Sequence, residues 1–149
     1  MSGKIFKRAL LGLVALAAGI QFVQPERGNP PSDPAGSFEA LVRPSPEAAA
    51  VTRRACQNCH SNLTVWPWYG WVAPASWVIA DDVKDGRAKL NLSEWNRLGH
   101  EAARLRLRAM CKEARDGDMP LWQYKLLHRE SRLTEGDVSA LCSLESAQR

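Results

Sequence analysis

The chain has 149 residues, of which 45% are hydrophobic and 24% are charged. This length and composition are typical of a single globular domain. The formal net charge is +4, but Lys4, Lys7 and Arg8 supply three of these charges and leave residues 25–149 at +1. A folded part that is nearly neutral argues against nucleic acid as a partner, because nucleic-acid-binding domains carry a basic surface.

The first 23 residues have the pattern of an export sequence. A basic segment at residues 4–8 precedes Ala9–Val23, which is apolar apart from Gln21. The apolar run of about 15 residues is shorter than the 20 or so of a typical spanning helix. We favour an uncleaved membrane anchor with the basic residues left in the cytoplasm. Cleavage near Ala15-Leu16-Ala17, which would release the domain into the periplasm, stays open.

A proline-rich segment at residues 24–44 predicts an extended linker between the anchor and a domain at residues 45–149. The domain begins with a helix start, in which Ser45 is the N-cap, Pro46 the first helical residue and Glu47 an acid in the first turn. We expect a helix over residues 46–60.

That helix ends in Cys56-Gln57-Asn58-Cys59-His60, a CxxCH motif. This spacing is typical of c-type haem attachment, in which two thiols bond the porphyrin edge and the histidine binds the iron. Residues three and four apart share one helix face, so Cys56, Cys59 and His60 converge. A zinc site would need about four ligands, usually from a second such pair, and a redox dithiol would need a βαβ context. A structural disulfide is the third alternative. We predict one covalent haem, with Cys56 and Cys59 as thioethers and His60 as the proximal iron ligand.

Six tryptophans are unusual for this length, and four of them fall between residues 66 and 77. Large flat side chains are suited to enclosing a haem, and the alternative is that they fill a small core. We predict a haem pocket wall formed by Trp66, Trp68, Tyr69 and Trp77.

The remaining cysteines, Cys111 and Cys142, form an even pair. In an oxidising compartment such a pair favours a disulfide. The alternative is two buried thiols that act as small apolar residues.

The rest of the chain predicts helices only. A short helix is expected from Pro74 to Lys84, with Gly86 marking its end. Ser93 is expected to cap a longer helix that ends before Gly117, with an apolar stripe at Trp95, Leu98, Ala102, Leu105 and Ala109. Two further helices are expected over Leu121–His128 and from Thr134, which forms a capping box with Asp137 and precedes the buried stripe of Val138, Leu141 and Leu144. No segment alternates like a strand, so the fold class is all-α, a small cytochrome c-like helical domain.

The iron needs a second axial ligand opposite His60, and the candidates are Met119, Met110, His100 and His128. Met119 lies in a non-helical turn and is followed by a proline, which suits presentation from a rigid loop. Met110 falls within a predicted helix and His100 on its arginine-rich face, so packing and solvent exposure are the simpler interpretations. We predict Met119 as distal ligand, with His128 as the alternative, because Met/His ligation is usual for electron transfer.

Three motifs extend beyond CxxCH, with the patterns CxxCHSNxTxWPWYxxxAPxSW, DVxxGRxxLNxSxW and GxMPxxxYxxxH. Their matching residues are Cys56–Asn62, Thr64, Trp66–Tyr69, Ala73-Pro74 and Ser76-Trp77; Asp82-Val83, Gly86-Arg87, Leu90-Asn91, Ser93 and Trp95; and Gly117, Met119-Pro120, Tyr124 and His128. These residues resemble the small haem-binding domain family of bacterial envelope proteins. The resemblance implies covalent haem on Cys56 and Cys59 with His60 proximal, and makes both Met119 and His128 motif positions.

We therefore expect a haem c protein that transfers electrons on the periplasmic side of the bacterial inner membrane, with no catalytic residues of its own. Its redox partner is not indicated. The alternatives are a haem sensor or peroxidase-like enzyme with a displaceable distal ligand, and an assembly protein in which the haem is structural.

Overall fold

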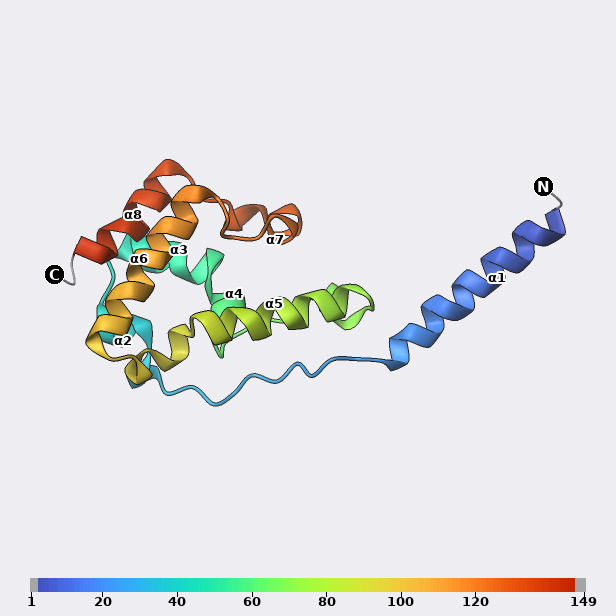
Figure 1. Cartoon of the computed structure of the whole chain (residues 1–149), viewed down its shortest axis with the longest axis horizontal. Helices are drawn as coiled ribbons and strands as arrows, with labels where there is room; N and C mark the ends of the chain where they lie inside the picture. Colours follow the sequence, from blue (N-terminus) through green and yellow to red (C-terminus); the bar gives the residue numbers. More distant parts are fainter. Residues whose placement is uncertain (1–2, 147–149) are drawn as a thin grey trace. The chain divides into compact units, whose positions relative to one another are not determined.

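The computed structural model describes residues 3–146, which form eight α-helices joined by short 3₁₀ turns (Figure 1). No strand occurs within these residues, so the all-α prediction is confirmed. The chain divides into two compact units. The first comprises residues 3–28 and 66–82, and the second comprises residues 29–65 and 83–146.

The first unit begins with helix α1, Gly3–Gly19, which continues as a 3₁₀ turn at Ile20–Phe22. Together they form 20 residues that are long and apolar enough to cross a membrane. At 1.5 Å per residue this run extends for about 30 Å, the thickness of a bilayer's hydrocarbon core. The expected N-terminal apolar helix is confirmed, and both a membrane anchor and an export signal meet the same criterion.

The aromatic segment of the first unit packs on the residues that follow α1. It contains a 3₁₀ turn at Trp68–Trp71 and the start of helix α5, Ala75–Lys89. The side-chain amide of Gln21 forms a reciprocal pair with the backbone of Ala73, donating to its oxygen at 3.1 Å and accepting from its nitrogen at 2.9 Å.

The second unit has its core among four helices: α2 (Phe38–Val42), α3 (Pro46–Ala55), α6 (His100–Asp116) and α8 (Glu135–Ser146). Helix α8 packs along both α6 and α3 (Figure 1). The shortest helices are α4 (Gln57–His60) and α7 (Trp122–Leu127). The core side chains are those of Phe38, Ala48, Val51, Leu92, Trp95, Leu107, Met110, Ala114, Leu141 and Leu144.

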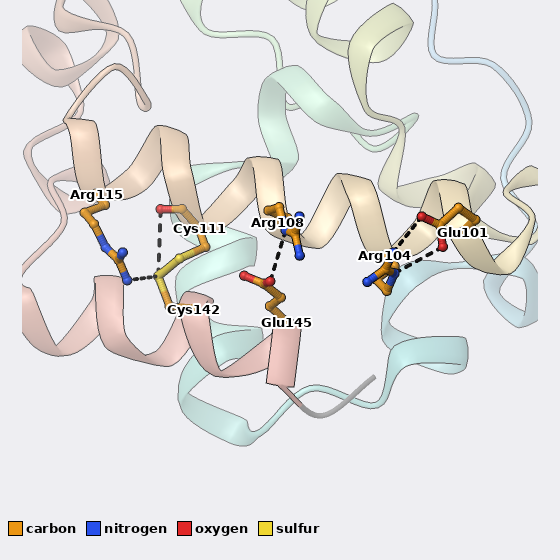
Figure 2. A network of polar contacts seen from close by, with 7 residues as sticks. All are labelled: Glu101, Arg104, Arg108, Cys111, Arg115, Cys142 and Glu145. Atoms are coloured by element: carbon orange, nitrogen blue, oxygen red, sulfur yellow. Dashed lines mark hydrogen bonds and ion pairs between the residues drawn. A yellow bond between two sulfur atoms is a disulfide. The ribbon is translucent and has the colours of Figure 1, made fainter. Parts of the chain in front are cut away.

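A covalent link and an ion pair join α6 to α8 (Figure 2). Cys111 and Cys142 form a disulfide with their Cα atoms 4.5 Å apart. Arg108 Nε lies 3.1 Å from Glu145 Oε1, and Arg115 Nη2 lies 3.6 Å from the sulfur of Cys142. The helix pair that carries much of the core is thus joined by a disulfide that starts from the buried Cys111 and by an ion pair.

The segment expected to be an extended linker contributes to the core. It forms a 3₁₀ turn at Pro34–Gly36 and helix α2, whose N-cap Ser37 accepts a hydrogen bond from the Ala40 nitrogen. Phe38 is only 1% exposed and meets Trp95 edge-to-face with ring centroids 5.0 Å apart. The proline content of the segment did not indicate this helix, because its packing depends on the contact of Phe38 with Trp95, a residue distant in sequence.

The predicted long helix starts later than expected. Residues Leu92–Arg97 form a 3₁₀ turn, and α6 begins after Gly99. Ser93 is not the N-cap of α6, because its hydroxyl instead accepts a hydrogen bond from the Asn62 nitrogen at 3.0 Å. The part of the predicted buried stripe that falls within α6 was also wrong. Leu105 and its neighbours Ala102 and Ala109 are exposed, and the buried face consists of Leu107, Met110, Cys111 and Ala114.

Three predicted helix boundaries are confirmed. The hydroxyl of Ser45 caps α3 by accepting from the Ala48 nitrogen. Gly117 ends α6 in the left-handed conformation, with φ of 78°. Thr134 and Asp137 form the capping box of α8, in which each backbone nitrogen donates to the other's side chain.

Candidate functional site

The CxxCH motif occupies a break between two helices. Helix α3 ends at Ala55, Cys56 has φ of −119°, and α4 adds a single turn through His60. The His60 nitrogen still donates to the Cys56 oxygen at 2.9 Å. The motif therefore stays one hydrogen-bonded turn that brings both cysteines and the histidine together, although the predicted helix over 46–60 is not continuous.

The imidazole of His60 is oriented by the C-terminal end of α5. Its Nδ1 lies 2.9 Å from the Gly86 oxygen and 3.2 Å from the Leu90 oxygen. Both oxygens are acceptors, so Nδ1 carries the proton and Nε2 keeps its lone pair. Metal-ligating histidines usually donate their other ring nitrogen to a carbonyl in this way, which fixes the ring and increases its basicity.

Burial also keeps His60 neutral. It lowers the pKa of the imidazole below its ordinary value, and this outweighs the hydrogen bonds to the Leu90 and Gly86 carbonyls, which act to raise it. A neutral imidazole with a free Nε2 is the form that binds a metal ion.

A cavity of about 350 Å³ adjoins His60 in the second unit. This volume falls within the range of about 300–1,000 Å³ typical of small-molecule and cofactor sites. Its wall is mainly apolar and includes Cys56, Leu90, Ala109, Pro120, Leu133 and Leu141. Two cationic side chains, Lys89 and Arg106, and one acidic side chain, Glu113, also line it.

Burial sets the protonation state of the cavity-lining cysteine. It raises the pKa of the Cys56 thiol to about 12, and the nearby Cys59 adds to this effect. The thiol of Cys56 is therefore neutral at physiological pH.

Two methionines line the same cavity, Met119 and Met110. Met119 is positioned by the end of α6, where the nitrogens of Asp118 and Met119 both donate to the Glu113 oxygen at 3.1 and 3.2 Å. This turn depends on Gly117, because its positive φ is unfavourable for other residues. Met110 belongs to the helix core, as the sequence predicted, and also contributes to the cavity wall.

His128 is placed elsewhere and is not among the side chains that line this cavity. Its ring stacks on Tyr124, with centroids 4.1 Å apart and planes at 13°, and its Nδ1 lies 2.9 Å from Glu130 Oε1. Tyr124 in turn accepts a hydrogen bond from the Asn58 side-chain amide at 2.8 Å. His128 thus supports the residue that contacts the CxxCH motif. His100 is exposed.

A second set of contacts, absent from the sequence predictions, holds the residues after His60. Arg87 donates from Nε to the Ser61 oxygen at 2.8 Å and from Nη2 to the Thr64 hydroxyl at 2.9 Å. Thr64 donates to the Asn58 oxygen at 2.7 Å. Thr64 and Arg87 are motif positions in the sequence, but neither helix periodicity nor residue type reveals that the two side chains bond to each other.

Gly86 allows α5 to approach the motif closely. A Cβ at this position would lie 2.5 Å from the Cys59 oxygen and 3.0 Å from its carbonyl carbon. Gly86 is not the helix end predicted from the sequence, because α5 continues to Lys89. Its role is to let the backbone of α5 reach Cys59 and His60.

The four aromatic residues predicted as a pocket wall, Trp66, Trp68, Tyr69 and Trp77, belong to the first unit. None is among the side chains that line the cavity of the second unit. The Trp77 indole donates instead to the Val23 oxygen at 2.6 Å, and Trp68 meets Tyr69 edge-to-face. Trp77 thus contacts the residues that follow α1, a placement that sequence periodicity did not indicate.

The donor set suits haem. A neutral histidine with a fixed tautomer, a cysteine and two thioethers adjoin an apolar cavity, and Lys89 and Arg106 match the charge of propionates. A small all-helical domain with this site is of the haem-binding class. The haem-binding domain family model matches residues 15–145, so the chain belongs to that family. Comparisons with curated proteins and with solved structures gave no match.

Proposed function

We propose that this protein is a c-type cytochrome that transfers electrons on the periplasmic side of the bacterial inner membrane. The observation that carries the proposal is the setting of His60, whose Nδ1 is hydrogen-bonded to two carbonyl oxygens beside a cavity lined by Cys56 and Met119. This arrangement fits a histidine that binds iron through Nε2 in an apolar, water-poor site.

The side chains with a proposed role toward the haem include Cys56, which lines the cavity, and Cys59, which does not. Cys56 and Cys59 form the thioethers, His60 is the proximal ligand and Met119 the distal ligand. Lys89 and Arg106 are the cationic partners for the propionates. Gly86 and Arg87 hold the attachment segment in place.

When bound, haem supplies one-electron chemistry. A thioether ligand is neutral and favours ferrous iron, so it raises the reduction potential. Met119 as a second iron ligand would leave no open position for oxygen or peroxide on the bound haem. These two effects favour electron transfer over catalysis, and the protein needs no catalytic residues for it.

Two features support the proposed location. Helix α1 and the turn after it are long enough to span the membrane, and Lys4, Lys7 and Arg8 at its start favour a cytoplasmic N-terminus. The disulfide between Cys111 and Cys142 is of the kind that persists in an oxidising compartment. Both support an anchored domain that faces the periplasm.

The first test is covalent attachment. The full chain is produced in a bacterium that matures c-type cytochromes, and membranes are analysed by haem staining after denaturing electrophoresis and by a reduced-minus-oxidised spectrum. We expect stain at the mass of the chain, lost in the variant Cys56→Ala/Cys59→Ala and retained in the matched variant Cys111→Ala/Cys142→Ala. Stain absent from the wild type would overturn covalent attachment.

The second test assigns the distal ligand. A ferric methionine-ligated haem shows a weak charge-transfer band. We expect the variant Met119→Ala to lose this band and to have a lower reduction potential than the wild type. Met110→Ala is the matched control, because Met110 lines the same cavity, and His128→Ala tests the alternative ligand. Loss of the band in either control but not in Met119→Ala would contradict the assignment. Rapid peroxide turnover by the wild type would instead favour an enzyme.

A further inference from the structure

The aromatic loop of the first unit, residues 66–73, is attached to the end of the apolar helix by several hydrogen bonds. Gln21 lies in the last turn of the 20-residue apolar run, and its side chain pairs with the Ala73 backbone at 2.9 and 3.1 Å. Trp77 donates to the Val23 oxygen at 2.6 Å. The loop is therefore fixed to the residues at which the proposed membrane span ends.

Arg27 adds a second attachment a few residues later. Its Nη1 donates to the Gly70 oxygen at 3.2 Å, and its guanidinium lies 4.0 Å from the centre of the Trp71 ring. Arg27 therefore holds Gly70 and Trp71, in the same loop whose Ala73 contacts Gln21 at the end of the apolar run. Arginine and tryptophan are both favoured at the level of lipid headgroups.

The outer surface of this loop is apolar and exposed. Trp68 is 78% exposed and Trp71 56% exposed, and Val72 is also exposed, as is Val78 in the first turn of α5. Phe22 and Val23, at the end of the apolar run, are exposed as well. Tryptophan has an apolar ring and a polar N–H, so it prefers the boundary between hydrocarbon and water.

We propose that the loop 66–73 inserts Trp68 and Trp71 into the headgroup region of the bilayer that α1 spans, forming a second membrane attachment. This rests on the anchor assigned in the proposed function. We expect the bilayer to cover the exposed tryptophans, because Gln21 and Ala73 are in direct contact. This contact places the loop at the depth at which the membrane span ends. The loop thereby gives the protein a second contact with the membrane interface, in addition to helix α1.

The test uses the full-length holoprotein, one copy per nanodisc of phosphatidylethanolamine and phosphatidylglycerol. Single variants Trp68→Cys, Trp122→Cys and Leu11→Cys are labelled with a charged, water-soluble maleimide. Trp122 is the matched control, because it is 70% exposed but belongs to α7 in the second unit. Each labelling rate is divided by that of the same variant after unfolding, and the haem spectrum verifies the fold.

We expect the thiol at position 68 to react roughly tenfold or more slowly than the thiol at position 122, because a side chain buried about 5–10 Å into the boundary between headgroups and acyl chains is shielded from a charged reagent in water. Equal rates at the two positions, with the thiol at position 11 protected, would overturn the loop proposal and leave the anchor intact. Rapid labelling at position 11, or an intact mass that lacks residues 1–23, would overturn the anchor itself. In that case covalent haem is judged separately, by its own spectrum.

Discussion

The Nδ1 atom of His60 and the carbonyl oxygen of Gly86 lie 2.9 Å apart, and this contact joins the CxxCH turn to the end of α5. Gly86 contributes in two ways, because its oxygen orients the imidazole and its missing Cβ leaves space for the Cys59 backbone. Helix α5 is thus a support for the proximal side of the proposed haem.

Gly86→Ala should weaken this support. The added Cβ would overlap the Cys59 carbonyl, so we expect a loss of about 1–3 kcal/mol of stability and a lower yield of covalently bound haem per protein. Gly136→Ala is the control, because a Cβ there meets only the Thr134 hydroxyl at 3.7 Å. Haem content and denaturant midpoints measure both effects. Equal behaviour of the two variants would contradict the close packing.

Tyr124→Phe should remove one hydrogen bond from the CxxCH motif. The Asn58 amide then loses its acceptor, and we expect about 1 kcal/mol of destabilisation. A double-mutant cycle with Asn58→Ala isolates this contact from the bond that Asn58 accepts from the Val65 nitrogen. A coupling energy of zero in denaturant titrations would show that the two side chains act independently.

Removal of the disulfide should cost more than removal of the neighbouring ion pair. Cys111 and Cys142 are 31 residues apart, so Cys111→Ala/Cys142→Ala should lose about 3–4 kcal/mol through the greater freedom of the unfolded chain. Glu145→Gln breaks the pair with Arg108, in which the arginine side chain is 56% and the glutamate 22% exposed, and should cost about 1 kcal/mol. Thermal or chemical unfolding ranks the variants, and a reversed order would refute this account.

Asp137→Asn should change how stability depends on pH. Hydrogen bonds from the Thr134 backbone, then from the Arg54 side chain, lower the pKa of the Asp137 carboxyl below its ordinary 3.8. Its folded-state pKa lies below the unfolded value, so its stabilisation is present above 3.8 and is lost as pH falls through the folded pKa. We expect the variant to lose about 1–2 kcal/mol at neutral pH.

The same variant should approach the wild type in acid. Denaturant titrations between about pH 2 and pH 7 measure the difference in unfolding free energy at each pH. A difference that stays constant over this range would show that the carboxylate charge contributes nothing.

Local signals along the chain were sufficient for the helix ends that depend on one or two neighbouring residues. Ser45, Gly117 and the pair Thr134 and Asp137 act within a single turn, so the sequence placed them correctly. Ser93 had the same local pattern but bonds to Asn62, which is distant in sequence. Phe38 was missed for the same reason, since its partner Trp95 is remote along the chain.

The sequence by itself determined the all-helical class, the apolar N-terminal helix and the turn that holds the CxxCH residues, because each depends on composition or on residues within one helical turn. Tertiary structure decided what supports that turn. Gly86, Arg87 and Tyr124 reach it from other helices, and the aromatic loop joins the residues that follow α1. Such contacts arise when distant segments pack together, and no local periodicity records them.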